Sequence, residues 1–178
     1  MASALDPPVD PARDHVLGGP DAPVTLVEYG DYECPYCGAA QPAVRELARR
    51  MGDGLRFVFR HLPLADRHPH AIDAAEAAEA AGAQGRFWAM HDLLFEHQRA
   101  LEPGDLRGYA RELGLDLERF EADLAAHRGR ARIDDDVRSA ERSGVSGTPA
   151  FFLDGEPYEG FYDAESLEDA VRAAAGGR

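Results

Sequence analysis

Two cysteines, Cys34 and Cys37, are the only cysteines of this 178-residue chain, and two residues separate them in the stretch CPYC. Thiols at this spacing can bind a metal, form a structural disulfide or exchange disulfides with other thiols. A zinc site takes about four protein ligands, and none of the seven histidines pairs with the cysteines at a finger-like spacing. A disulfide across so short a loop constrains the unfolded chain very little. We therefore expect thiol–disulfide chemistry, without a bound metal or cofactor.

The position of Cys34 relative to the expected secondary structure favours catalysis. Pro35 suits the first position of a helix that the apolar spacing predicts over 35–51. Cys34 is therefore the expected N-cap, where the first backbone N–H groups of the helix and the helix dipole stabilise a thiolate. Because the thiolate is the attacking species, Cys34 is the predicted nucleophile, exposed to substrate. Cys37, one turn further on, is the predicted resolving thiol.

The elements expected around the cysteine pair follow the order βαβ, helical block, ββα, which predicts an α/β fold. Apolar and β-branched residues indicate strands at 24–29 and 55–60 on either side of the 35–51 helix, and such a unit pairs its strands in parallel. Helical spacing then predicts four or five short helices over 70–142. The last expected elements are a strand at 150–153, an Asp154-Gly155 turn, a short strand near 157–159 and a helix capped by Asp163.

The length of the chain suits one domain with a core of its own. We expect this domain to span residues 24–178, with the helical insertion at about 67–144. Residues 1–23 are rich in proline, aspartate and glycine, and we expect them to form a tail that packs late, if at all.

The composition excludes several classes of protein. The net charge is −14 and all 19 basic residues are arginine, with no basic run, so neither nucleic acid nor an anionic membrane is an expected partner. No segment approaches the ~20 apolar residues that span a bilayer. The N-terminus lacks the basic and apolar regions of a secretory signal, which predicts a cytoplasmic protein, or an exported one if a signal has been removed. No segment typical of a dimer interface is evident, so a monomer is expected.

A second stretch, VSGTPAFF at 145–152, completes a larger pattern. CPYC after VTLVEYGDYE, a helical block, then GVSGTPAFFLDG and a final helix resemble the thioredoxin superfamily. The large helical block resembles the DsbA-like branch of thiol–disulfide oxidoreductases in particular. The resemblance covers about residues 15–175. It implies the thioredoxin fold with a helical insertion, and the activity of a protein disulfide oxidoreductase.

The resemblance also implies which residues contact a substrate. By position, Pro149 is the cis-proline that faces the cysteine pair in this family. Thr148 is expected to pair through its backbone with an extended substrate segment, like an added strand. Pro35 and Tyr36, between the cysteines, are included among the expected substrate contacts. The strongest oxidants of the family carry histidine at the position of Tyr36, so this substitution argues against a strong oxidant.

Glu28 matches the buried acid that, in this family, accepts the proton of the resolving thiol. The residues alone show that Glu28 interrupts an otherwise apolar strand, which is unusual for a purely structural side chain. The alternative is an edge carboxylate that pairs with Arg60 or His61.

Three functions therefore follow from the sequence. The first is disulfide exchange with protein or peptide thiols, together with an unidentified redox partner, in either the oxidising or the reducing direction. The second is a glutaredoxin-type reductase that depends on a small thiol, since Pro-Tyr also occurs between the cysteines of glutaredoxins. The third belongs to another class, a thioredoxin-like module that binds peptides through the groove at Pro149 without redox turnover.

Overall fold

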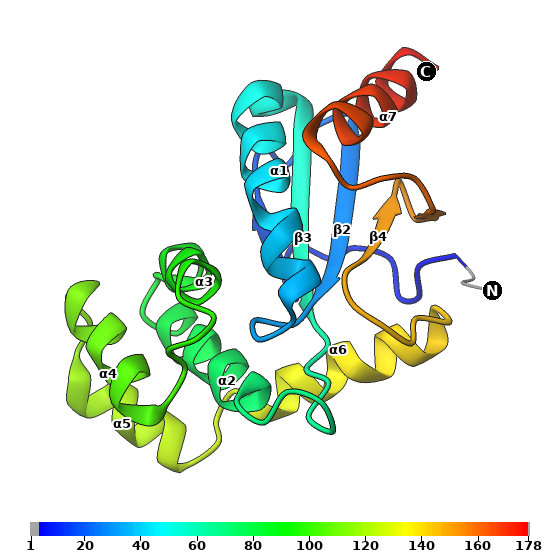
Figure 1. Cartoon of the computed structure of the whole chain (residues 1–178). Coiled ribbons are helices and arrows are strands. Elements are labelled where there is room, and N and C mark those ends of the chain that lie inside the picture. The colour runs from blue at the N-terminus through cyan, green and yellow to red at the C-terminus, as the bar shows by residue number, and fades with distance from the viewer. Residues whose placement is uncertain (1–3, 178) are drawn as a thin grey trace.

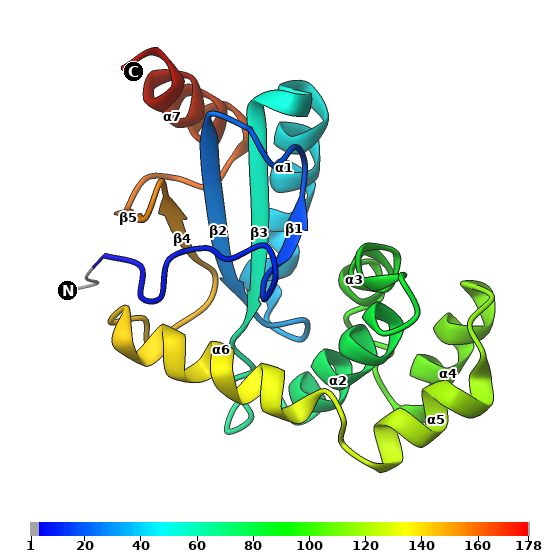
Figure 2. The same ribbon diagram turned by 180° about the vertical axis from the view of Figure 1, so that it is seen from behind.

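The computed structural model describes residues 4–177; residues 1–3 of the expected tail and Arg178 of the expected domain lie outside the described residues. A five-stranded mixed sheet forms the centre, in the order β1-β3-β2-β4-β5 (Figures 1 and 2). The strands are β1 (His15–Leu17), β2 (Val24–Gly30), β3 (Leu55–His61), β4 (Ala150–Leu153) and β5 (Glu156–Tyr158).

Within the described residues, seven α-helices accompany the sheet: α1 (Pro35–Met51), α2 (Ala71–Gly82), α3 (Phe87–Glu96), α4 (Pro103–Glu112), α5 (Leu117–Ala125), α6 (Arg130–Arg142) and α7 (Ala164–Gly176). Helices α1 and α7 pack on one face of the sheet, and α6 crosses to the other face (Figure 1). Helices α2 to α5 form a block at one end of the molecule (Figure 2). The expected order βαβ, insertion, ββα is confirmed, with five helices in the insertion.

Strand β2 lies in the middle of the sheet, parallel to β3 and antiparallel to β4, and all seven of its residues are buried. Successive side chains of a strand point to opposite faces. Leu26 and Glu28 therefore face α1 and α7, whereas Val27 and Tyr29 face α6. This alternation places the one acidic side chain of β2 on the face where the cysteine-bearing helix packs.

A tight turn returns the chain from β4 to β5. Asp154 and Gly155 both have positive φ, 51° and 88°. A two-residue hairpin requires this conformation at both central positions, which explains the Asp-Gly pair. The hairpin fixes β4 beside β2, so that Pro149 stands at the start of β4 near the C-terminal end of β2.

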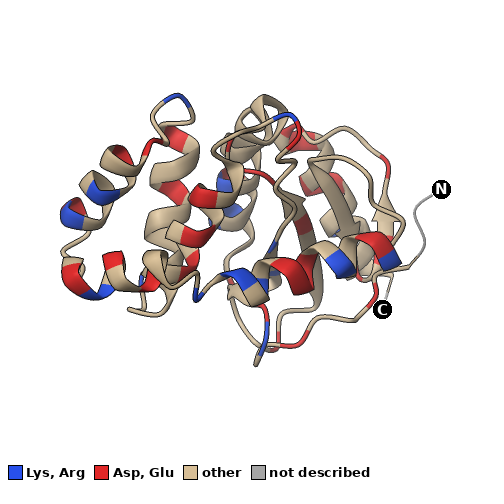
Figure 3. Cartoon of the chain, turned by 90° about the horizontal axis from the view of Figure 1, so that it is seen from below, with Lys and Arg blue, Asp and Glu red and all other residues tan. Residues whose placement is uncertain are grey.

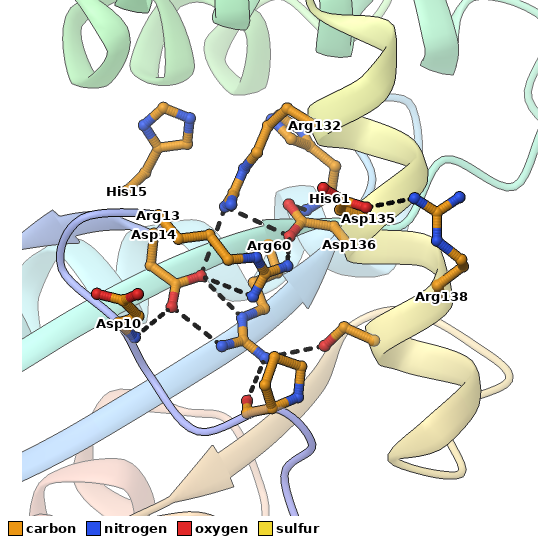
Figure 4. Close-up of polar contacts among 12 residues, drawn as sticks. Asp10, Arg13, Asp14, His15, Arg60, His61, Arg132, Asp135, Asp136 and Arg138 are labelled. Carbon is orange, nitrogen blue, oxygen red and sulfur yellow. Dashed lines mark hydrogen bonds and ion pairs between the residues drawn. The ribbon is translucent and has the colours of Figure 1, made fainter.

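The expectation that residues 1–23 form a loosely packed tail is wrong for the described part of that segment. His15–Leu17 form the edge strand β1, which pairs antiparallel with β3. Arg60 of β3 donates from Nε and Nη2 to the two carboxylate oxygens of Asp14, each at 3.0 Å, and both side chains are fully buried (Figure 4). Arg60 also donates to the carbonyls of Pro7 and Pro8. A buried guanidinium needs such partners, and the N-terminal segment supplies them.

We expect Asp14→Ala to lower the free energy of unfolding by about 3–5 kcal/mol, because it leaves the buried charge of Arg60 without its carboxylate. Denaturant titration measures this change. Asp134→Ala is the matched control, since the Arg130–Asp134 pair is half exposed and such surface pairs contribute about 0–1 kcal/mol. Equal losses in the two variants would show that the N-terminal segment does not hold the fold together.

Candidate active site

The cysteine pair lies where β2 ends and α1 begins. Cys34 is the N-cap of α1 and Pro35 is its first residue, as the sequence predicts. Both cysteines are free thiols. The Cys34 Sγ lies 3.5 Å from the backbone carbonyl oxygen of Thr148 and donates a hydrogen bond to it when the thiol is protonated. Residues that are 114 positions apart therefore meet directly at this sulfur.

Cys34 is less accessible than the sequence led us to expect. The residue is only 3% exposed, and Cys37 is 0% exposed. The loop that carries Thr148 lies against Cys34 and accounts for part of this cover. A substrate sulfur that approaches Cys34 must therefore displace the contact with the Thr148 carbonyl.

The environment of Cys34 lowers the pKa of its thiol to about 5. The largest cause is a hydrogen bond from the Cys37 thiol; burial opposes it, and the Thr148 side chain and the backbone N–H groups of Cys37 and Tyr36 add to the lowering. These two backbone groups are the smallest of the causes, and the Cys34 side chain forms no cap hydrogen bond that meets full geometric criteria. At neutral pH Cys34 is thus a thiolate, and its neighbouring thiol stabilises it more than the helix terminus does.

Cys37 behaves in the opposite way. Burial, followed by its hydrogen bond to Cys34 and the charge of Glu28, raises the pKa of the Cys37 thiol far above its ordinary value. The two thiols therefore differ in protonation at neutral pH, one ionised and one neutral. Groups whose environments separate their pKa values in this way are suited to distinct acid and base roles.

Glu28 lies on the same face of the sheet as the cysteine pair and is 0% exposed. Neither of its carboxylate oxygens has a hydrogen-bond partner among the described residues. Burial, and secondly the charge of Cys34, raise the pKa of Glu28 to about 8. The alternative interpretation of Glu28, an edge carboxylate that pairs with Arg60 or His61, is wrong. Strand β2 is a central strand, Arg60 binds Asp14 and His61 binds Glu79.

The residues expected to contact substrate gather around the same end of the sheet. The Thr148–Pro149 peptide bond is cis, and both residues are partly buried. Pro35 is exposed, and Tyr36 is 64% exposed, which is high for an aromatic side chain. A cavity of about 300 Å³ borders Pro149 and is lined in part by Tyr158.

Gln98, between α3 and α4, contacts the site without any signal in the sequence. Its Nε2 donates to the carbonyl oxygens of Tyr32 and Cys34, at 2.9 and 2.8 Å. A side chain at Gly38 would stand 2.0 Å from the Gln98 amide oxygen, so any other residue there would displace the Gln98 amide. Gln98 thereby attaches the helical insertion to the turn that carries the nucleophile.

Two histidines of the insertion bind the carboxylates next to Cys34. His68 Nδ1 lies 2.7 Å from Asp31 Oδ2, and His70 Nδ1 lies 2.8 Å from Glu33 Oε1. The hydrogen bond to Glu33 is the main cause that raises the pKa of His70. Both carboxylates beside Cys34 therefore have a hydrogen-bonding partner in the insertion. These contacts join positions 37 residues apart in each case, which a sequence pattern does not reveal.

The family model described as Thioredoxin matches residues 11–173. The chain belongs to the thioredoxin family. A thioredoxin-like oxidoreductase from Silicibacter pomeroyi DSS-3 is 38% identical, with a TM-score of 0.81 and 94% of both chains covered. BdbD from Bacillus subtilis, in its oxidised form, shares the fold at 23% identity, with a TM-score of 0.85 over 99% of this chain and 98% of that chain. The thioredoxin-like fold of DsbA-type proteins is thus shown.

Curated relatives are similar over a limited part of their length. The Na(+)/H(+) antiporter NhaA 1 of Salinispora arenicola is 59% identical over 170 residues, which is 96% of this chain and 26% of that protein. The protein of the same name from Mycobacterium sp. (strain KMS) is 48% identical, over 96% of this chain and 28% of its own length. The chain thus spans about a quarter of the curated relatives it matches. Within residues 4–177, none of the helices is long and apolar enough to cross a bilayer.

The low pKa of Cys34 makes a direct prediction for alkylation. The rate of reaction of the reduced protein with iodoacetamide should rise with pH through a midpoint of about 5, rather than near the ~8.5 of free cysteine. Cys37→Ala should move this midpoint upward, because it removes the main hydrogen bond to the thiolate. Cys37→Ser keeps a hydroxyl donor and should move it less. A midpoint in the unaltered protein near that of free cysteine would contradict the geometry.

Proposed function

We propose that the chain is a protein disulfide oxidoreductase that exchanges disulfides with protein or peptide thiols through Cys34 and Cys37. One observation carries the proposal: a thiol with a pKa of about 5 is hydrogen-bonded to a second, fully buried thiol that keeps its proton. A purely structural cysteine pair has no need of this difference.

In the reducing direction, the Cys34 thiolate attacks one sulfur of a substrate disulfide. A Cys34–substrate disulfide forms, the substrate S–S bond breaks, and the released thiolate takes a proton. Cys37 then loses its proton and attacks the Cys34 sulfur, which forms the Cys34–Cys37 disulfide and releases the second substrate thiolate. The substrate gains two electrons and the cysteine pair loses them. The same steps in reverse oxidise a substrate dithiol.

Glu28 is the proposed acceptor of the Cys37 proton. A thiol with so high a pKa cannot attack until a base removes its proton. When Cys34 enters the mixed disulfide, its negative charge disappears, and with it one of the two causes that raise the pKa of Glu28. The pKa of Glu28 then falls, Glu28 releases its own proton to solvent, and the carboxylate that results can accept the proton of Cys37.

Thr148 and Pro149 are the proposed substrate platform, with Pro35 and Tyr36 at its margin. The Thr148 carbonyl oxygen lies 3.5 Å from the Cys34 sulfur, so the Thr148 backbone is within reach of an extended segment bound at that sulfur. On the face that Figure 3 shows, acidic and basic residues are interspersed along the helices. Recognition through the backbone therefore suits this surface better than recognition through one charged patch.

The structural observations favour exchange over a binding module, because a peptide-binding module needs neither the low pKa of Cys34 nor an unpaired buried acid. A glutaredoxin-type reductase stays the second candidate and differs in its need for a small thiol. We also propose that the protein is a cytoplasmic monomer that exchanges electrons with a redox partner. The antiporter activity named for the curated relatives belongs to proteins about four times longer than this match.

Turnover of a peptide disulfide tests the two cysteine roles. Cys34→Ser should abolish turnover, because it removes the nucleophile. Cys37→Ser should accumulate a mixed disulfide between Cys34 and the substrate, visible by mass spectrometry under non-reducing conditions. The assay is run with and without glutathione, which separates the protein-disulfide and glutaredoxin-type activities. Peptide binding with full function in Cys34→Ser would establish the binding module instead.

Glu28→Gln tests the buried acid through stability as well as rate. The Glu28 carboxyl keeps its proton up to about pH 8 in the folded protein but ionises near pH 4.5 when exposed. Folding is therefore weakened as pH rises across this interval, by up to ~1.4 kcal/mol per pH unit. Glutamine cannot ionise, so the variant should gain stability over the unaltered protein between these pH values.

Release of the second substrate thiol should also slow in Glu28→Gln, by about 10²-fold or more, while formation of the mixed disulfide changes little. Denaturation at several pH values and rapid-quench kinetics give the two readouts. Parallel stability profiles would show that Glu28 titrates normally, and an unchanged rate of resolution would show that it does not accept the proton.

A further inference from the structure

A second group of chemically active side chains lies away from the cysteine pair, where β1, β3 and α2 meet. His15 Nε2 lies 2.6 Å from Glu79 Oε1, and His61 Nε2 lies 2.8 Å from the same oxygen. The three ligand atoms all lie within 4.8 Å of one another. Figure 4 draws His15 and His61 next to the Asp14–Arg60 pair. Two imidazoles and a carboxylate thus converge on one point from three separate elements.

The surroundings hold both imidazole rings in place. The His15 ring stacks on Phe87, with the ring centroids 3.5 Å apart and the planes 5° from parallel. His61 is 1% exposed, and its ring meets Phe59 and Tyr32 edge to face. The packing therefore restricts the rotamers of both histidines and holds the nitrogens that face Glu79 in one orientation. Such preorganisation is a condition for tight metal coordination.

Glu79 is anchored through the stem of its side chain. A side chain at Gly129 would lie 2.7 Å from the Glu79 Cβ, so the start of α6 packs closely against the Glu79 stem. One of its carboxylate oxygens, Oε1, lies within hydrogen-bond distance of both imidazoles. The carboxylate is therefore placed to act as the third ligand.

Two histidines and one carboxylate are a ligand set for a divalent transition metal, as in catalytic zinc sites that keep a position open. Tetrahedral zinc with bonds of ~2.0–2.1 Å separates its ligand atoms by ~3.3 Å. The observed separations of 2.6 and 2.8 Å need to grow by only about 0.5–0.7 Å, within the freedom of the Glu79 side chain, which is 13% exposed. The adjustment is small compared with the reach of a glutamate.

A cavity of about 320 Å³ borders Glu79 and is also lined by Asp123 and by three arginines, Arg119, Arg128 and Arg132. It offers a route for an ion and room for a water molecule as fourth ligand. Each of these arginines has a carboxylate partner: Arg132 lies 3.5 Å from Asp14 and 3.3 Å from Asp136, and Arg119 and Arg128 lie 3.9 and 3.1 Å from Asp123. The cavity therefore does not present an uncompensated cation at the entrance.

We propose that His15, His61 and Glu79 form a binding site for a divalent transition-metal ion of the zinc type. The ion would join the edge strand β1 and strand β3 to helix α2, and so fasten the helical insertion to the sheet. This inference is independent of the proposed thiol chemistry. The ligands lie 64 and 18 residues apart along the chain, a spacing that resembles no zinc motif, so the sequence does not reveal them.

The test uses the full chain with Cys34→Ser and Cys37→Ser, because thiolates would otherwise bind the same metals. Zinc is titrated into the metal-free protein by calorimetry, and Co²⁺ is used as a spectroscopic probe. We expect one ion per chain, a higher Tm in the presence of zinc, and ligand-field bands of four- or five-coordinate Co²⁺. His15→Asn and Glu79→Gln in the same background should each weaken zinc binding at least tenfold.

His97→Asn is the matched control, because His97 is exposed and bonds the backbone carbonyl of Leu93; its zinc affinity should match that of the background protein. Circular dichroism checks that each variant is folded. The proposal is overturned if the folded background protein binds no zinc at millimolar concentration, or if His15→Asn and Glu79→Gln bind zinc as tightly as their parent. In either case the three residues form only a hydrogen-bonded cluster.

Discussion

The site depends on one hydrogen bond, in which the Cys37 thiol donates to the Cys34 thiolate. A helix dipole typically contributes only ~0.3–1 kcal/mol, less than one pKa unit at ~1.36 kcal/mol per unit. That falls well short of the drop to about 5 in the Cys34 pKa. The remaining stabilisation must come from direct donors, and Cys37 is the largest. Because Cys37 is fully buried, its proton stays in place and the bond persists until Cys34 loses its charge.

The two faces of the sheet treat buried charge in opposite ways. On the face covered by α6, Arg60 is satisfied by Asp14, by two backbone carbonyls and by the Ser139 hydroxyl. On the face covered by α1, Glu28 has no partner among the described residues. An unpaired buried carboxyl weakens folding, and a buried ion pair with full hydrogen bonding does so far less. Arg60, whose role is structural, therefore has a full set of hydrogen-bond partners. Glu28, which is the proposed proton acceptor, has none among the described residues.

Local signals fixed much of the fold in advance. The spacing and Pro35 predicted α1 with the bounds that the structure has, and the Asp-Gly turn and the Asp163 cap were predicted correctly. The sequence does not indicate strand β1, because three residues in a proline-rich segment carry no periodic signal. The neighbouring contact between Asp14 and Arg60 joins residues far apart in the chain, which a local pattern does not reveal. The burial of Cys34 could not be predicted either, because Thr148, which packs against it, lies 114 residues away in the sequence.

The helical insertion takes part in the site. Gln98 holds the carbonyl of Cys34, and His68 and His70 bind the carboxylates that flank the nucleophile. Each contact comes from the insertion, and each acts on the backbone or the charge immediately before α1. A movement of the insertion relative to the sheet would therefore change both the geometry of the N-cap and the negative charge beside the thiolate.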